Sequence, residues 1–135
     1  MPPAEPRGRF RAPSRVRKRR EYQAIQSEGV RVSLAHFVLI LAARSATPDA
    51  MPRLGITASR KIGGAVVRNR AKRLVREAFR ATRELFPPDI DVVVIVKREL
   101  AGLRLSDVVE QWQSARGLIA RRAQLARRNL AEKPA

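Results

Sequence analysis

One amphipathic segment, residues 65–86, most constrains how this chain can fold. Its apolar side chains recur at helical spacing and fall on one side of a helical wheel, as Val67, Ala71, Leu74, Val75 and Ala78. The pair Pro87-Pro88 ends the segment, because proline lacks an amide proton and disfavours helix in the residue before it. The pattern predicts a long helix with one side turned toward a protein core.

The segments around this helix predict a small sheet. Five consecutive apolar residues, Val92–Val96, indicate a strand that is buried on both faces. Runs rich in β-branched and aliphatic residues predict three earlier strands, at 30–34, 37–43 and 53–58. Two further helices are predicted, one at 14–29 and one from Ser106 to about Arg122, whose inner stripe includes Trp112 as a core residue.

The resulting order of elements is αβββαβα. It predicts the α+β class, as a two-layer sandwich of a four-stranded sheet with helices. With 135 residues, the chain has room for one domain. We expect a disordered basic arm at 1–14, where prolines recur and apolar residues are scarce, a single domain at 15–122, and a basic C-terminal tail at 123–135 that frays.

The charge of the chain predicts a polyanionic partner. Lys and Arg number 29 against 12 Asp and Glu, so the net charge is +17 and self-repulsion is large unless an anion binds. The absence of cysteine excludes disulfides, zinc ribbons and thiol catalysis. The N-terminal residues contain no apolar run, so they do not form a secretory signal, and no stretch approaches the ~20 apolar residues of a membrane span; we expect a soluble cytoplasmic protein with no membrane partner.

The polar side of the central helix carries that charge in rows. Arg68, Lys72, Arg76 and Arg80 recur every four residues, and Asn69 and Arg73 form a second row beside them. Like charges at this spacing destabilise a helix by roughly 0.2–0.5 kcal/mol a pair, so a charged ligand explains them better than helix stability does. Arginine suits phosphate because its planar group can donate two parallel hydrogen bonds. The alternative is a solvated face that lacks acids.

At this helix the sequence resembles a known family. The stretch SRKIGGAVVRNRAKRLVREAFR is similar to the signature of the bacterial ribonuclease P protein component, in which a basic loop with glycine precedes Ala-Val, Arg-Asn-Arg and Lys-Arg-x-x-Arg-Glu. The matching residues here are Lys61, Gly63, Ala65, Val66, Arg68, Asn69, Arg70, Lys72, Arg73, Arg76 and Glu77. The resemblance in element order, size and basicity extends over roughly 15–122.

The resemblance implies a subunit of ribonuclease P, an endoribonuclease that matures the 5′ end of tRNA. In this family the RNA partner is the catalyst and requires Mg²⁺, while the protein binds the catalytic RNA and the 5′ leader of precursor tRNA. The chain itself would hold no catalytic residue, metal or cofactor. The residues implied to contact the catalytic RNA are Arg68, Asn69, Arg70, Lys72, Arg73 and Arg76. The family also implies a left-handed crossover between two parallel strands, against the usual right-handed rule.

The family binds the leader in a cleft between its first helix and its sheet. Position for position, the resemblance implies that this cleft is lined by Arg17, Lys18, Tyr22, Phe37, Ser59, Arg60 and Lys61. Single-stranded RNA is commonly held by stacking on aromatic rings above a basic floor. Each aromatic residue has an alternative role: Phe37 opens an aliphatic strand and is more often core than platform, and Tyr22 is balanced between the two.

Other residues are weaker candidates for a site. Gly63-Gly64 lack the remainder of a phosphate-binding loop, and His36, the sole histidine, fits a strand edge. Asp89 and Asp91 could bind a divalent ion, although two carboxylates after Pro-Pro are more often a solvated turn. No acid and base fall together in a plausible pocket. The alternatives to the ribonuclease P assignment are a structural ribosomal-type RNA-binding protein and, less favoured, a DNA-binding protein.

Overall fold

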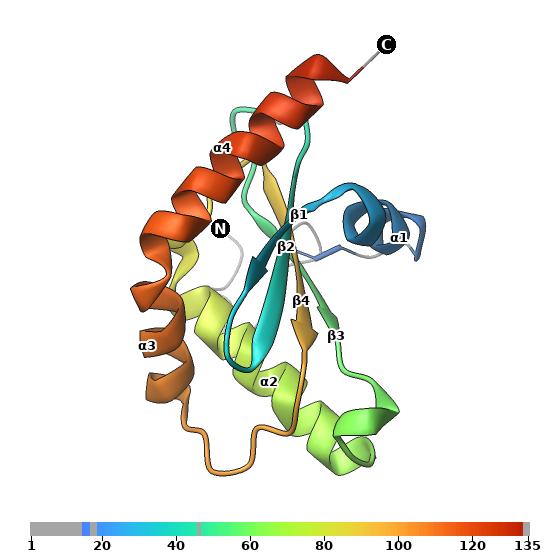
Figure 1. Ribbon diagram of the computed structural model, residues 1–135, viewed down its shortest axis with the longest axis vertical. Coiled ribbons are helices and arrows are strands. Elements are labelled where there is room, and N and C mark those ends of the chain that lie inside the picture. The colour runs from blue at the N-terminus through green and yellow to red at the C-terminus, as the bar shows by residue number, and fades with distance from the viewer. Residues whose placement is uncertain (1–14, 17–18, 46, 134–135) are drawn as a thin grey trace, which may run out of the picture.

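The computed structural model describes residues 15–16, 19–45 and 47–133. The predicted arm at 1–14 and the predicted site residues Arg17 and Lys18 lie outside the described residues. The elements follow the order shown in Figure 1: α1 (Arg19–Glu28), β1 (Val30–Ser33), β2 (Phe37–Ala43), β3 (Arg53–Thr57), the 3₁₀ turn η2 (Arg60–Ile62), α2 (Ala65–Ala81), the 3₁₀ turn η3 (Arg83–Leu85), β4 (Ile90–Val96), α3 (Leu105–Ser114) and α4 (Arg116–Glu132).

The four strands form one mixed sheet in the order β1-β2-β4-β3. β2 pairs antiparallel with both β1 and β4, with Leu39 opposite Val94, whereas β3 pairs parallel with β4. β4 therefore lies inside the sheet, and β3 lies at one edge. This position explains the apolar run of β4, because an inner strand covered on both faces has no polar side.

Helices cover both faces of the sheet. α2, α3 and α4 pack on one face, where Val92, Val94 and Trp112 belong to the larger core. α1 packs on the opposite face, where Ile25 joins Val93 in a smaller cluster. The single tryptophan is fully buried and meets the ring of Phe37 edge-on at 5.8 Å between ring centroids. The predicted α+β class and four-stranded sheet are confirmed, as is the core position of Trp112.

The C-terminal helices differ from the prediction. The single helix expected from Ser106 to about Arg122 is two helices, because the backbone departs from helical geometry at Ala115, with φ −95° and ψ 8°. Ser106 is not the N-cap; the amide of Arg104 donates to Asp107 Oδ2 at 2.9 Å where α3 begins. The expectation that the chain frays after Arg122 was wrong for residues 123–132, which continue α4.

The connection β3–α2–β4 joins two parallel neighbours, as the family resemblance implies. Its left-handedness stays a prediction. Among the described residues, no helix combines the length and the hydropathy that a membrane crossing requires.

Candidate nucleic-acid interface

Two glycines set the start of α2. Gly63 has φ +146°, and a Cβ built on it would lie 2.8 Å from the Cβ of Val67, so a side chain there would be both strained and crowded. Gly64 is the N-cap, and its carbonyl accepts the amide of Arg68 at 2.9 Å. The predicted core side of the helix is buried, with Ala71, Val75 and Ala78 at 0–1% exposure. α2 is thus a fixed support for the polar residues on its other sides.

Those polar residues point in three directions. Lys72 and Arg76 face the β3 edge of the sheet, where they line a cleft with α1. Asn69 and Arg73 are exposed on the outer side of the helix. Arg70 points toward the loop between β4 and α3. The helix therefore presents basic groups to solvent and to a cleft at the same time.

The charges on α2 are not neutralised within the protein. In the part of the chain that the structure describes, no ion pair forms at Arg68, Lys72, Arg73, Arg76 or Arg80. By contrast, Arg44, Arg53 and Arg127 on other elements all pair with aspartates. Five basic side chains without an acid partner among the described residues thus lie along one helix, an arrangement that suits an external polyanion.

Arg70 differs from its neighbours in the signature. Its Nη1 donates to the carbonyl of Leu100 at 3.2 Å and its Nη2 to that of Leu103 at 3.0 Å. Both carbonyls belong to the loop that leads from β4 into α3. Arg70 therefore ties this loop to α2, a role that the sequence pattern does not indicate.

The cleft beside α2 has a volume of about 210 Å³. It lies along the β3 edge and draws its walls from α1, β3, α2 and the segment at residues 15–16. The residues that line it are Arg15, Val16, Tyr22, Leu54, Ile56, Lys72 and Arg76. The aromatic ring of Tyr22 from α1 and the cations of Lys72 and Arg76 from α2 thus lie in one small concave site.

Tyr22 is fixed in this cleft by the backbone of β3. The amide of Ile56 donates to Tyr22 Oη at 3.2 Å. The ring also lies over Gly55, where an added Cβ would stand 2.8 Å from Tyr22 Cε1. Gly55 is therefore required for the ring to approach the strand this closely, and the ring keeps part of its surface exposed.

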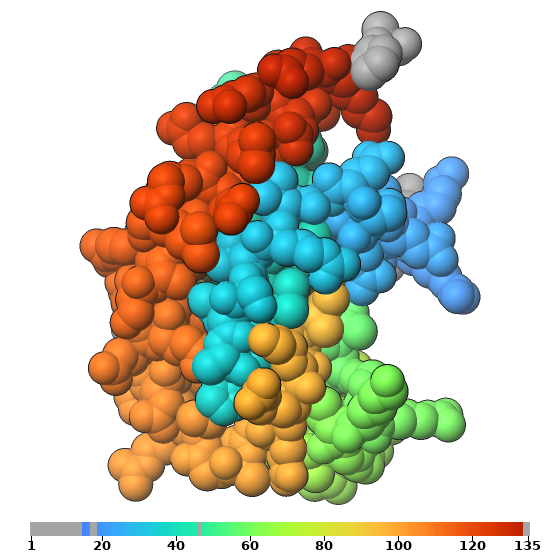
Figure 2. All heavy atoms as spheres, viewed as in Figure 1, coloured from blue at the N-terminus to red at the C-terminus, as the bar shows by residue number. Residues whose placement is uncertain are grey.

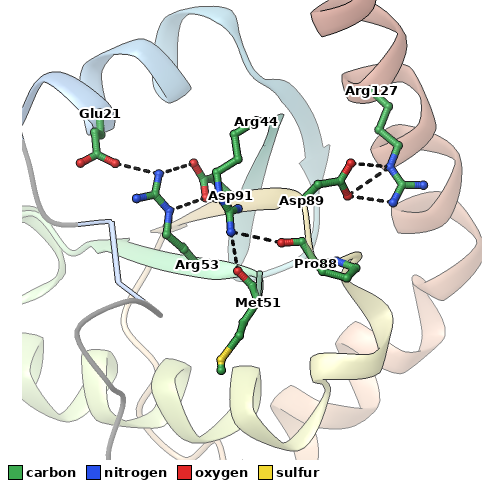
Figure 3. Close-up of polar contacts among 8 residues, drawn as sticks. All are labelled: Glu21, Arg44, Met51, Arg53, Pro88, Asp89, Asp91 and Arg127. Atoms are coloured by element: carbon green, nitrogen blue, oxygen red, sulfur yellow. Dashed lines mark hydrogen bonds and ion pairs between the residues drawn. The ribbon is translucent and has the colours of Figure 1, made fainter. Parts of the chain in front are cut away.

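A chain of ion pairs holds α1 beside β3 (Figure 3). Glu21, which precedes Tyr22, contacts Arg53 Nη2 at 2.7 Å, and Arg53 also donates two hydrogen bonds of 2.8 Å to the carboxylate of Asp91. Arg44 donates a third, at 2.8 Å. The hydrogen bonds from Arg53 to Asp91 raise the pKa of the Arg53 guanidinium. The network links α1 to β3 and β4 and so fixes the height of Tyr22 above the sheet.

The two aspartates after Pro-Pro have different environments: Asp89 lies in the turn before β4 and is partly exposed, whereas Asp91 belongs to the strand. Asp91 is buried, at 5% exposure, and is occupied by two arginines. Asp89 binds Arg127 of α4, at 2.8 Å from its Oδ1 to Nη2. Gly55 and Arg53 were not predicted as part of a site, and Asp91 was considered only as a ligand of a divalent ion. Arg53 and Asp91 could have been identified only from the strand register that places them opposite each other, and this register exists only once the strands have paired.

Phe37 is a correction. Its side chain is 0% exposed and packs against Trp112 in the larger core, on the face of the sheet opposite to α1. A ring without exposed surface cannot stack on a base, so the prediction that Phe37 lines the cleft was wrong. The alternative role, a core residue at the start of an aliphatic strand, is confirmed.

Ser59, Arg60 and Lys61 are exposed at the far end of β3. Arg60 and Lys61 belong to the 3₁₀ turn that leads into α2, and Ser59 caps it without a side-chain hydrogen bond. They do not line the cleft of Tyr22. They instead lie between the carboxyl end of β3 and the start of α2, at the same edge of the sheet (Figure 1).

The sole histidine is held by an amide side chain. His36 Nδ1 lies 3.2 Å from Gln111 Nε2, and the backbone amide of His36 donates to Gln111 Oε1 at 3.4 Å. Among the described residues, no three histidines, cysteines or acids gather where they could hold a metal ion. The geometry found here, free cations beside an aromatic cleft, is suited to binding.

Comparison with known proteins agrees with the geometry. A family model described as Ribonuclease P matches residues 10–120. The ribonuclease P protein component of Syntrophus aciditrophicus is 39% identical over 97 residues, which cover 72% of this chain and 79% of the relative. The ribonuclease P protein of Thermotoga maritima has a similar structure, with TM-score 0.66 and 32% identity over 79% of this chain and 96% of the other. That of Staphylococcus aureus has TM-score 0.66 and 26% identity over 78% and 94%.

Proposed function

This chain belongs to the ribonuclease P protein family, and from that premise we propose that it docks on the catalytic RNA through α2 and holds the 5′ leader of precursor tRNA in the adjoining cleft. As the protein component it is a subunit of a holoenzyme whose RNA carries out catalysis. The alternative of a structural ribosomal-type protein is not favoured by these relatives.

The observation that carries the proposal is the cleft at the β3 edge. Its lining combines Tyr22 with Lys72 and Arg76 of the signature helix. A stacked base contributes about 1–3 kcal/mol to the binding of single-stranded RNA, and cations beside it bind the phosphates. We therefore assign Tyr22 to the leader, with Ser59, Arg60 and Lys61 further along the same edge, and Lys72 and Arg76 as residues shared with the catalytic RNA.

The outer side of α2 is assigned to the catalytic RNA. Asn69 and Arg73 are exposed there, Arg68 is half-buried on the same helix, and neither arginine has an acid partner in the described part of the chain. Lys72 and Arg76 lie between the two surfaces and can contact either RNA. Arg70 contributes by fixing the loop that leads to α3, and its remaining donors can reach RNA. We assign the Mg²⁺ requirement of the reaction to the RNA partner.

Reconstitution tests this function directly. The protein is combined with the catalytic RNA of the same organism, and 5′ processing of precursor tRNA is followed at low Mg²⁺ concentration. We expect the protein to accelerate processing there, because its cations screen the repulsion between two RNAs. Equal rates with and without the protein would contradict the proposal.

A single substitution tests the cleft. Tyr22→Ala should weaken holoenzyme binding to precursor tRNA by roughly 5- to 150-fold, the equivalent of one stacked base at about 1–3 kcal/mol, and leave mature tRNA unaffected. Gln23→Ala, at an exposed neighbouring position of α1, is the matched control and should behave as the wild type. Equal losses for precursor and mature tRNA would remove Tyr22 from the leader site.

A further inference from the structure

The outer face of α4 carries a second group of unpaired arginines. Arg121, Arg122 and Arg128 are exposed, and in the described part of the chain none of them forms an ion pair or a side-chain hydrogen bond. Arg121 and Arg128 lie two turns apart, about 10 Å along the helix axis, and therefore point to the same side. We call these three residues the α4 arginines.

α4 holds these arginines on a rigid support. Ile119, Ala123 and Ala126 are buried against the sheet, at 0–4% exposure, and α4 packs on β1 and β2. Two ion pairs fasten the helix near its end, Arg127 with Asp89 and Lys133 with Glu28. Arg127 and Lys133 thus have acid partners, whereas the α4 arginines are exposed to solvent.

Residues 121–132 of α4 lie beyond the segment that the family model matches, which ends at residue 120. The known signature on α2 therefore does not account for its charge. A solvated face would be stabilised by acids at helical spacing, and Glu132 is the only acid in the helix. The excess of one sign indicates a negatively charged partner.

We propose that the α4 arginines form an additional docking surface for the phosphate backbone of the catalytic RNA; this inference rests on the proposed function. α4, α3 and α2 cover the same face of the sheet, and α3 packs on both of the others. Figure 2 shows α3 and α4 as one continuous flank of the molecule. An RNA docked on the outer side of α2 is therefore on the side where α4 lies.

The catalytic RNA is a better partner for this surface than the leader. The cleft of Tyr22 lies at the β3 edge, whereas α4 packs over β1 and β2 at the other end of the strand order. The outer strands are roughly 14 Å apart, and α1, which forms one wall of the cleft, lies on the face of the sheet opposite to α4. A large folded RNA can span both helices.

The salt dependence of binding to the catalytic RNA alone tests the proposal. The triple variant Arg121→Gln, Arg122→Gln and Arg128→Gln keeps side chains that favour helix and removes three positive charges. Each lost phosphate contact lowers the log–log slope of affinity against salt by about 0.7–0.9, so we expect a reduction of roughly 2 to 2.7. An unchanged slope overturns the proposal.

A matched variant separates contact from net charge. Arg19→Gln, Arg20→Gln and Arg31→Gln also removes three charges, at exposed positions of α1 and β1 on the other side of the sheet. The slope of this control variant should differ from that of the wild type by no more than about 0.7–0.9, the equivalent of one phosphate contact. Equal reductions in the two triple variants would show that only net charge matters, and would overturn the proposal.

Two further measurements make the outcomes distinguishable. Gln124→Arg adds a charge to the same exposed face and should steepen the slope by about 0.7–0.9, a gain that loss of folding cannot mimic. The α4 triple variant could instead bind the catalytic RNA alone as the wild type does and show a defect only with precursor tRNA. That result would assign the α4 arginines to precursor tRNA and overturn the proposal. If the wild type neither binds the catalytic RNA nor accelerates processing, the proposed function itself fails.

Discussion

At the scale of single residues, the cleft depends on a glycine as much as on its tyrosine. The ring of Tyr22 reaches the amide of Ile56 only because Gly55 has no side chain beneath it. Gly55→Ala would place a Cβ 2.8 Å from the ring, so the ring must move. We expect the variant to lose about 1–3 kcal/mol of unfolding free energy through overpacking and to bind precursor tRNA more weakly, as thermal melting and binding assays would measure.

Gly64→Ala is the control for this substitution. A Cβ at Gly64 meets no atom within 4 Å, and the residue has an ordinary negative φ. That variant should keep its affinity for precursor tRNA. If Gly55→Ala bound the precursor as the wild type does, the position of Tyr22 would not matter to the leader.

The arginines of the signature are not equivalent at this scale. Arg70→Ala removes the hydrogen bonds to Leu100 and Leu103, and should lower the unfolding free energy by about 1 kcal/mol. Amide hydrogen exchange should also become faster in the loop between β4 and α3. Arg73→Ala, at an exposed position of the same helix, should leave both properties unchanged. Equal exchange rates in the two variants would contradict the role of Arg70 as a tie between α2 and the loop.

At the scale of elements, α4 is fastened by a pair whose strength depends on pH. The hydrogen bond from Arg127 lowers the pKa of Asp89 below its ordinary value of 3.8. A carboxyl group with a lowered folded-state pKa stabilises the fold above its unfolded pKa, and this contribution is lost as pH falls through the folded pKa. Both side chains are partly exposed, at 27% and 45%, so the pair contributes about 0.2–1 kcal/mol.

Asp89→Asn should therefore be less stable than the wild type by this amount between about pH 5 and 8, and the difference should shrink below pH 3.8. Denaturant melts at a series of pH values would measure it. Asp49→Asn removes an exposed carboxylate that has no ion pair in the described part of the chain, and serves as the control. A difference that grew toward low pH would have the wrong sign for this account.

The elements also show what sequence can and cannot predict. β2 and the start of α2 were predicted at their observed residues, because an apolar run and a glycine pair are local signals. The break at Ala115 was missed because the apolar stripe of Val108, Trp112 and Ile119 continues through it, although Gly117 follows two residues later. The turn there follows from the need of α4 to cover β1 and β2, which is a tertiary requirement.

The candidate site divides in the same way. The residues of α2 could be found from their spacing along one helix. The burial of Phe37 depends on which face of the sheet it occupies, and the pairing of Arg53 with Asp91 depends on strand register. Both are long-range properties that no local pattern carries. The role of Gly55 likewise exists only once α1 lies over β3.

At the scale of the whole molecule, the fold separates structural charge from binding charge. The arginines that pair with Asp89 and Asp91 fasten α1 and α4 to the sheet, while those of α2 remain unpaired in the described part of the chain. The +17 net charge is thus not an even coating. The central claim is that the outer side of α2 binds the phosphates of the catalytic RNA.

Comparing two single-charge variants tests that claim most directly. Arg73→Gln removes a free guanidinium from the outer side of α2, and Arg31→Gln removes an exposed one from β1 on the far side of the sheet. Affinity for the catalytic RNA is measured across a salt series for both variants and the wild type. We predict that Arg73→Gln lowers the log–log slope by about 0.7–0.9 and that Arg31→Gln leaves it unchanged. Identical slopes for the two variants would contradict the account.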